Sequence, residues 1–275
     1  MVCRASSNTT RYWGVNDTRY EGRSKGCDTD LTKQLEMPSY YREDGPKLLE
    51  KYAANQTRAI VEAKTITLSG DEFMALLRSP SRSPLIFLGD ASSTGGTYVL
   101  RIRVRSPMNI SFGRFRGGKP ILFLPGDYAY VGSALAKRGA TCLSRRLMRH
   151  AARTDKQSAH SIQRVMQAAF VKKGMGHGDL RPLNGKRFHW HVDYLLDHDY
   201  VDLIGAYIIR SPLAIEPELG RMLAADPGVA IIEPGLGASD IPGNTNLLAV
   251  RNRKWWHSLP EKLQTLMSET ATDFS

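Results

Sequence analysis

The chain has little of several features that mark whole classes of proteins. It contains only three cysteines in 275 residues, and Cys3, Cys27 and Cys142 stand apart without metal-ligand spacing. An odd number of scattered cysteines argues against a disulfide framework or a cysteine zinc cluster, and favours a reducing compartment. No uninterrupted apolar run approaches the roughly 20 residues that span a bilayer, and the start has no apolar segment of the secretory type. We therefore expect a cytoplasmic, nucleoid or nuclear protein that is neither secreted nor embedded in a membrane.

Acidic residues are also too few to balance the basic ones. The chain has 38 Lys and Arg but 27 Asp and Glu, which gives a formal net charge of +11. Residues 91–275 carry 25 basic and 15 acidic residues, whereas residues 1–90 carry 13 and 12. A basic excess favours a polyanionic partner, because neutralising phosphates releases their condensed counterions. Ordinary solubilising charge is the competing interpretation, and composition does not separate the two.

The first 80 residues lack the periodic patterns of regular structure. Residues 6–30 form a polar tract with few aliphatic side chains, and the SPSRSP stretch at 79–84 has the composition of a linker. We therefore predict a poorly ordered or peripheral extension over residues 1–80. The folded domain is expected over residues 90–250, and a C-terminal helical tail over residues 251–275.

The segment Thr97–Arg105 has the clearest pattern in the chain. Leu100, Ile102 and Val104 alternate with arginines, and this period of two is typical of a half-buried strand. A basic, glycine-rich turn follows at residues 113–119.

Further strands and helices are predicted after this turn. Strands are expected at ILFL, YAYVG, VDLIGAYII, VAII and NLLAV. Helices are expected through CLSRRLMRHAAR with Thr141 as its cap, over Ser158–Lys173, and from Pro217 to about Ala225. Strands and helices without strict alternation indicate an α+β fold.

Two tyrosines stand beside glycines on neighbouring predicted strands. Gly96 and Tyr98 belong to the triplet GTY, and Tyr130 and Gly132 to the triplet YVG. Paired tyrosines are more often core or sheet-face residues than functional ones, and glycines often begin or end a strand. The two triplets alone therefore leave a structural role as the simpler interpretation.

The helix expected after the second tyrosine carries two polar side chains beside an apolar stripe. Leu143 and Leu147 are four residues apart and should face the sheet, and Arg146 and His150 flank them at the same spacing. An arginine at the edge of a core can present a rigid fork of donors to a phosphate. The pattern fits a solvated basic helix equally well, since other arginines occupy its remaining faces: Arg145, Arg149 and Arg153.

The order of the motifs gives a resemblance to a known family. GTY, YAYVGSA, RLMRH, HWHVDYLL, EPEL and PGLGASD follow one another between about Gly95 and Val250. This series resembles the uncharacterised branch of the GIY-YIG nuclease superfamily that occurs alone or fused to endonuclease III-type DNA glycosylases. The resemblance implies a small α+β domain. Its sheet should be a central, mainly antiparallel three-stranded one flanked by helices, with additional strands.

The resemblance also implies an activity. By it, the protein would be a divalent-metal-dependent endonuclease that hydrolyses phosphodiester bonds in DNA rather than RNA, linked to DNA repair and to a repair-protein partner. Tyr98 would activate or position the attacking water, with Tyr130 in support. Arg146 would stabilise the charge of the transition state, and His150 would assist near the scissile phosphate. The glycines of the two triplets would belong to the same site.

One carboxylate in the EPEL helix is expected to hold the metal. The resemblance implies a single Mg²⁺ or Mn²⁺ ion on Glu218, and a hydrated hard cation suits one carboxylate. Glu216 competes for this role, and Glu218 is preferred. An acid in the first turn of a helix also interacts favourably with the helix dipole, which is a structural reason for either residue.

The last loop departs from the family pattern. Classical members carry an asparagine after their glutamate, which the PGLGASD loop does not supply. Members of this branch usually have cysteines and a histidine further on, whereas this chain lacks the cysteines and has Asn246 in place of the histidine. These departures support an alternative, a catalytically inactive nucleic-acid-binding module on the same scaffold. A non-nuclease hydrolase or a protein-interaction domain is a third interpretation.

Two aromatic-rich stretches remain open in interpretation. His189 and His191 are expected on one strand face with Asp193 next along it, a spacing that suits zinc without an evident further ligand. Hydrogen-bonded structural histidines are the commoner case, so His189, His191 and Asn246 are kept as accessory candidates. Trp255 and Trp256 either stack on bases or cover the core.

Overall fold

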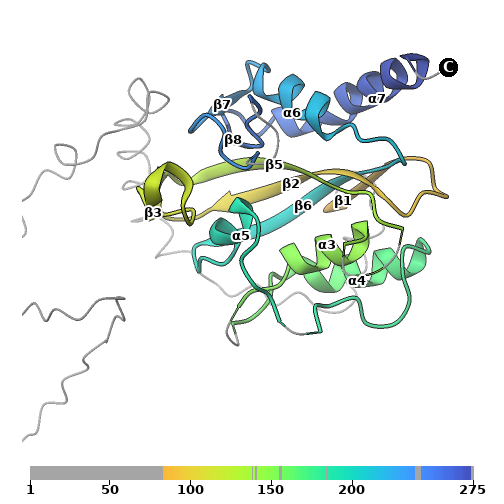
Figure 1. Cartoon of the computed structure of the whole chain (residues 1–275), viewed down its shortest axis with the longest axis horizontal. Coiled ribbons are helices and arrows are strands. Elements are labelled where there is room, and N and C mark those ends of the chain that lie inside the picture. Colours follow the sequence, from red (N-terminus) through yellow and green to blue (C-terminus); the bar gives the residue numbers. More distant parts are fainter. Residues whose placement is uncertain are drawn as a thin grey trace, which may run out of the picture. The chain divides into compact units, whose positions relative to one another are not determined.

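The computed structural model in Figure 1 describes residues 83–273, except residues 138, 140, 155–156, 184 and 239–242. The extension predicted over residues 1–80 lies outside the described residues. Among the helices of the described part, none is long and apolar enough to cross a membrane.

A six-stranded sheet forms the centre of the described part. Its strands lie in the order β1 (Leu85–Gly89), β6 (Val201–Arg210), β2 (Gly96–Val104), β5 (Gly126–Ala134), β8 (Leu247–Val250) and β7 (Val229–Ile231). β1 pairs with β6 in parallel, and the other pairings are antiparallel. The expected α+β fold with a mainly antiparallel sheet and additional strands is therefore confirmed.

Helices cover both faces of this sheet. α3 (Leu143–His150), α4 (Ile162–Lys172) and α5 (His191–Leu196) lie on one face, below the sheet in Figure 1. α6 (Glu216–Ala224) and α7 (Trp255–Asp273) lie on the other face. The segment between the two tyrosines adds a small second sheet of β3 (Met108–Ile110) and β4 (Ile121–Phe123), with the short helix η1 (Phe115–Gly118) between them.

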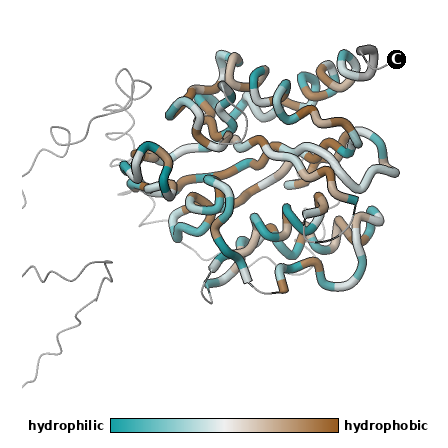
Figure 2. Tube along the Cα trace, viewed as in Figure 1, coloured by the Kyte–Doolittle hydropathy of each residue, from teal (hydrophilic) through white to brown (hydrophobic). Residues whose placement is uncertain are grey.

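The alternation in β2 divides the interior into two cores. Leu100, Ile102 and Val104 pack on the face of α3, α4 and α5, as their spacing predicts. Val99 faces the opposite core, which α6 and α7 close. Because both faces are covered, the central strands carry many apolar residues, and Figure 2 shows brown segments along them.

The helix α7 contributes to this second core. Three of its side chains are buried against the sheet: Trp256, Leu259 and Leu263. The ring of Trp256 stacks on Tyr207 at a centroid distance of 5.8 Å, and Trp255 is also buried. The two tryptophans therefore cover the core.

The HWHVDYLL stretch is a helix start, where the sequence pattern predicts a strand. The Oδ2 atom of Asp193 accepts hydrogen bonds from the backbone N–H groups of His189 and Trp190, at 2.9 and 3.0 Å. A carboxylate three residues into a helix that binds the free N–H groups before it stabilises that helix end. The cap predicted for α3 also differs, since Cys142 and not Thr141 occupies the N-cap position.

Candidate functional site

The site lies where β5 extends beyond β8. β8 pairs with residues 127–130 of β5, whereas β2 pairs with β5 along its full length to Ala134. The last residues of β5 therefore lie at an edge of the sheet. α3 covers one face at this edge and α6 covers the other.

The two predicted tyrosines meet His150 on the α3 face. The rings of Tyr98 and Tyr130 are 6.5 Å apart, and that of Tyr130 is 6.1 Å from the imidazole of His150. The Oη atom of Tyr98 is 2.9 Å from Nε2 of His150. All three side chains are almost fully buried.

A buried carboxylate continues this chain of contacts. Oδ1 of Asp193 lies 3.4 Å from Nδ1 of His150, and its Oδ2 accepts a hydrogen bond of 2.9 Å from Arg149. The ammonium group of Lys186 lies 3.9 Å from Oδ1. With Asp193 on the Nδ1 side, Nε2 of the neutral imidazole is left as the acceptor for the Tyr98 hydroxyl.

Burial sets the protonation states of these groups. Desolvation raises the pKa of Tyr98 and of Tyr130 well above the usual value for a phenol. Desolvation lowers the pKa of His150, although the neighbouring Asp193 opposes this shift. The pKa of Asp193 lies far below its usual value, because its contacts with His150, Lys186 and Arg149 outweigh its burial. At neutral pH these contacts therefore connect a phenol, a neutral imidazole and a carboxylate.

Two arginines of α3 are held against one aromatic ring. The guanidinium carbon of Arg146 is 4.2 Å from the ring centroid of Trp190, and that of Arg149 is 4.4 Å from it. Arg146 also donates a 2.6 Å hydrogen bond to the carbonyl oxygen of Ser133 at the free edge of β5. These contacts fix a partly exposed positive charge beside the tyrosines.

Glu216, rather than the preferred Glu218, faces this edge from α6. Its carboxylate accepts hydrogen bonds from the hydroxyl of Ser133 and, at 3.0 Å, from the side-chain amide of Asn246. Its charge also contributes to the raised pKa of Tyr98, after the larger effect of burial. Glu218 is exposed and pairs with Arg221 at 2.9 Å. Of the two acids, Glu216 therefore lies beside the tyrosines, whereas the preferred candidate Glu218 points away from them.

The period of α6 explains the difference between the two acids. The buried side of the helix carries Leu219, Gly220 and Leu223. Glu216 precedes these residues by three, four and seven positions, which places it on the same side. Glu218 falls on the other side of the helix.

The two predicted glycines are structural, and one of them shapes the site. A Cβ atom on Gly132 would lie 2.6 Å from Oη of Tyr98, so glycine lets the tyrosine ring lie across β5. A Cβ atom on Gly96 would lie 2.0 Å from the carbonyl oxygen of Ile209, so Gly96 permits close pairing with β6. Gly220, which the sequence pattern does not single out, leaves room for the amide of Asn246.

Comparison with family models matches residues 97–269 to the family described as Domain of unknown function DUF123. The chain belongs to this family. The matched residues run from β2 into α7. They include all of the residues gathered at the free end of β5, which we call the edge site: Tyr98, Tyr130, Arg146, His150, Asp193 and Glu216. Comparisons with curated proteins and with solved structures returned no match.

The accessory candidates of the DUF123 domain take separate places. His191 accepts a 3.0 Å hydrogen bond at Nδ1 from the backbone of Gly237, and its ring packs 4.9 Å from Phe115. The ring of His189 packs against Trp190, and Asn246 binds Glu216. Within the described residues, no group of three or more His, Cys, Asp or Glu is placed to hold a metal ion.

Several residues of the site are not assigned to it by sequence reasoning. Asp193 is considered there only as a zinc ligand, and Trp190, Arg149 and Ser133 are given no role in it. The contacts of Asp193, Trp190 and Arg149 depend on how the loop before α5 folds back onto α3, whereas Ser133 contacts α3 and α6. The available indication was the acidic residue placed three positions after an aromatic one in HWHVD, a spacing that can start a helix.

Proposed function

We propose that the DUF123 domain of this protein is a divalent-metal-dependent endonuclease that hydrolyses phosphodiester bonds in DNA. The observation that carries the proposal is the contact chain from Tyr98 through His150 to Asp193, which ends at a sheet edge between Arg146 and Glu216. Tyr98, Arg146 and His150 are residues that the GIY-YIG resemblance implies for phosphodiester hydrolysis, and Glu216 takes the place of the implied Glu218.

The contact chain provides a path for the proton of an attacking water. Because burial raises the pKa of Tyr98, a free phenolate is not available at neutral pH. The water instead gives its proton to Oη of Tyr98 while the phenol proton moves to Nε2 of His150. Asp193 then stabilises the imidazolium. The water oxygen forms the new bond to phosphorus, the leaving oxygen departs with the electron pair of the broken bond, and solvent protonates it.

Arg146 supplies positive charge where the phosphate becomes more negative. Its guanidinium is already fixed by Trp190 and by the carbonyl oxygen of Ser133, so little reorganisation is needed during the reaction. Preorganised charge of this kind is among the largest contributions to catalysis.

Glu216 would hold the single divalent cation, which when bound neutralises charge on the phosphate oxygens. The residues fit such an ion. A partly exposed carboxylate is anchored by Ser133 and Asn246, and the buried Oδ1 atom of Asn246 has no hydrogen-bond partner among the described residues. Mg²⁺ commonly keeps most of its waters and takes one or two carboxylates.

A comparison of Glu216→Gln with Glu218→Gln tests the proposal. We expect the purified full chain to nick plasmid DNA with Mg²⁺ or Mn²⁺. Glu216→Gln, Arg146→Ala and Tyr98→Phe should each lower the rate by about 100-fold or more. Glu218→Gln is the matched control, because it removes the same charge from the exposed side of the same helix, and its rate should change less than about twofold. Absence of nicking by the unaltered chain with either metal would refute the proposal.

A nucleic-acid-binding module without catalysis is the second candidate. It is favoured by the hydrogen bonds that Glu216 already accepts from Ser133 and Asn246. In that case the unaltered chain binds DNA without nicking it, and Glu216→Gln leaves the affinity unchanged. Either function would place the protein with DNA, in the nucleoid or nucleus, where a DNA-repair partner is the expected interaction.

A further inference from the structure

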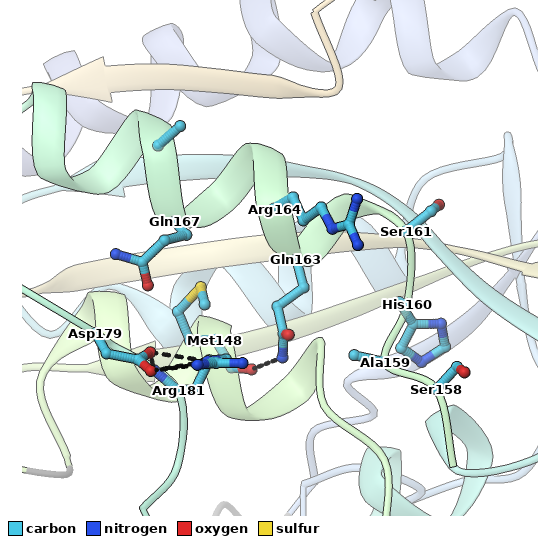
Figure 3. A pocket seen from close by; sticks show the side chains of 11 residues that line it. Met148, Ser158, Ala159, His160, Ser161, Gln163, Arg164, Gln167, Asp179 and Arg181 are labelled. Carbon is cyan, nitrogen blue, oxygen red and sulfur yellow. Dashed lines mark hydrogen bonds and ion pairs between the residues drawn. The ribbon is translucent and has the colours of Figure 1, made fainter. Parts of the chain in front are cut away.

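Two cavities beside the edge site are lined by arginines. The smaller one, of about 510 Å³, is lined by Arg145, Arg149 and Arg181 together with Leu180 and Leu183. The larger one, of about 1070 Å³, is shown in Figure 3, and Arg164 and Arg181 line it. Because Arg181 lines both cavities, they meet at this residue. We call the two together the arginine groove.

The arginine groove reaches the edge site through one shared side chain. Arg149 lines the smaller cavity and also packs on Trp190, as Arg146 does. The groove therefore begins next to the positive charge proposed to act on the scissile phosphate. It continues along α3 toward α4, which contributes Arg164.

The charges of the groove are only partly compensated. Arg181 forms an ion pair with Asp179, drawn as dashed lines in Figure 3. No described residue accepts a hydrogen bond from Arg145, and the Nη1 atom of Arg149 is buried without a hydrogen-bond partner in the described part of the chain. The smaller cavity has no acidic residue among its described lining residues. An anion therefore suits it.

The spacing of these arginines matches a chain of phosphates. Arg145 and Arg149 are one helical turn apart, about 6 Å along the axis of α3. At this spacing both guanidinium groups can contact phosphates of the same strand.

The apolar part of the lining favours a single strand. Leu183 is 88% exposed and lines the smaller cavity beside the arginines. A duplex keeps its bases stacked inside, whereas a single strand can place them against apolar side chains while its phosphates contact arginines. We propose that the arginine groove binds a single-stranded segment of nucleic acid that continues from the edge site. This groove proposal rests on the proposed nuclease function in one respect only, which is that the cleaved bond lies at the edge site.

Binding without metal tests the groove separately from catalysis. Fluorescence anisotropy would compare a labelled single-stranded oligonucleotide with a blunt duplex of the same sequence, on the full chain across a range of salt concentrations. We expect the single strand to bind more tightly than the duplex. Arg145→Ala and Arg181→Ala should each weaken binding by about 10-fold and lower the slope of log affinity against log salt by about 1.

Arg221→Ala is the matched control. Arg221 is exposed and paired with an acid, as Arg181 is, but it lies on α6 on the other face of the sheet. Its removal should leave the affinity unchanged, and thermal unfolding should show that all three variants are folded. Three results would each overturn the groove proposal. They are an equal loss of affinity in the three variants, equal affinity for the duplex and the single strand, and competition by polyglutamate as strong as that by the unlabelled single strand.

Cleavage assays separate the two proposals. If the chain cleaves DNA while Arg145→Ala and Arg181→Ala bind the single strand normally, the groove proposal fails and the nuclease proposal stands. If the protein cleaves nothing but binds the single strand through Arg145 and Arg181, the nuclease proposal fails and the groove proposal stands. If both are correct, these variants should slow cleavage of a substrate with a single-stranded tail more than that of a blunt duplex.

Discussion

The two faces of the central sheet differ in what they bury. On the face of α3 and α5, Tyr98, His150 and Asp193 form a buried polar chain inside an otherwise apolar core. On the other face, α6 and α7 pack mainly aliphatic and aromatic side chains, such as Leu219 and Leu263, against the same strands. Neighbouring residues of β2 alternate between these two environments.

Most of the residues proposed to carry chemistry lie on the first face, and Glu216 of α6 reaches the site from the other, where the remaining side chains mainly contribute stability. A buried polar chain costs free energy unless each member has a partner, whereas an apolar core stabilises by burial alone. On the polar face, a substitution that changes charge should therefore destabilise more than one that changes volume. On the apolar face, a substitution that changes volume should destabilise more.

The largest expected effect is on the polar face. Asp193→Asn keeps the shape of the side chain but removes the negative charge beside the buried Lys186 and Arg149. Lys186 keeps Asp197 at 3.9 Å, but the loss of the carboxylate shared with Arg149 should still lower the free energy of unfolding by about 3 kcal/mol, measured by urea denaturation.

A second substitution sharpens this test. Adding Lys186→Met removes one of the two cations beside position 193, so the double variant should regain part of the lost stability. A double variant less stable than Asp193→Asn alone would show that the ion pair is not the source of the effect.

An effect nearly as large is expected on the apolar face. Leu263→Ala in α7 removes a fully buried side chain and should lower the free energy of unfolding by about 3 kcal/mol. Below the melting temperature, nucleic-acid binding should stay unchanged, because α7 lies on the face opposite α3. A stability change below about 1 kcal/mol would mean that α7 is a dispensable tail after all.

The smallest effect is a pH dependence that belongs to the polar face alone. Nδ1 of His160 accepts a hydrogen bond from the backbone of Leu203, and Nε2 contacts the carbonyl oxygen of Leu196 at 2.8 Å. Burial lowers the pKa of His160 to about 3. As pH falls below about 6.5, the unfolded chain takes up a proton that the folded chain does not, so stability decreases toward pH 3.

Between pH 6.5 and 5 this difference amounts to about 2 kcal/mol from His160. Urea denaturation at both pH values should show it as a decrease in the free energy of unfolding. His160→Gln should have a shallower dependence over this range. An unchanged dependence in the variant would assign the titration to other groups.

Local patterns predict most of the sheet but not the contacts between distant segments. The alternation in β2 and the apolar stripe of α3 place Tyr98, Arg146 and His150 correctly, because each depends on a short repeat in the sequence. The same reasoning applied to α6 would have selected Glu216, since it shares a helical side with Leu219 and Leu223.

Other parts of the site depend on tertiary structure alone. Asp193 joins His150 because the loop before α5 folds against α3, and this long-range packing has no periodic trace in the sequence. The aromatic residues of HWHVDYLL have strand-like composition, but the hydrogen bonds that Asp193 accepts from the backbone begin a helix there. In this case a local side-chain contact outweighs intrinsic propensity.

The parallel strand β1 lies before the residues that match the family. It pairs with β6 from Leu85 opposite Ala206 to Gly89 opposite Arg210, and the carbonyl oxygen of Pro84 accepts a hydrogen bond from Ala206. A fragment trimmed to residues 97–269 would expose β6 from Ala206 to Arg210, with the backbone donors and acceptors that β1 pairs left free. Such an edge is a template for a second molecule. The match to the family therefore begins at a later residue than the central sheet does.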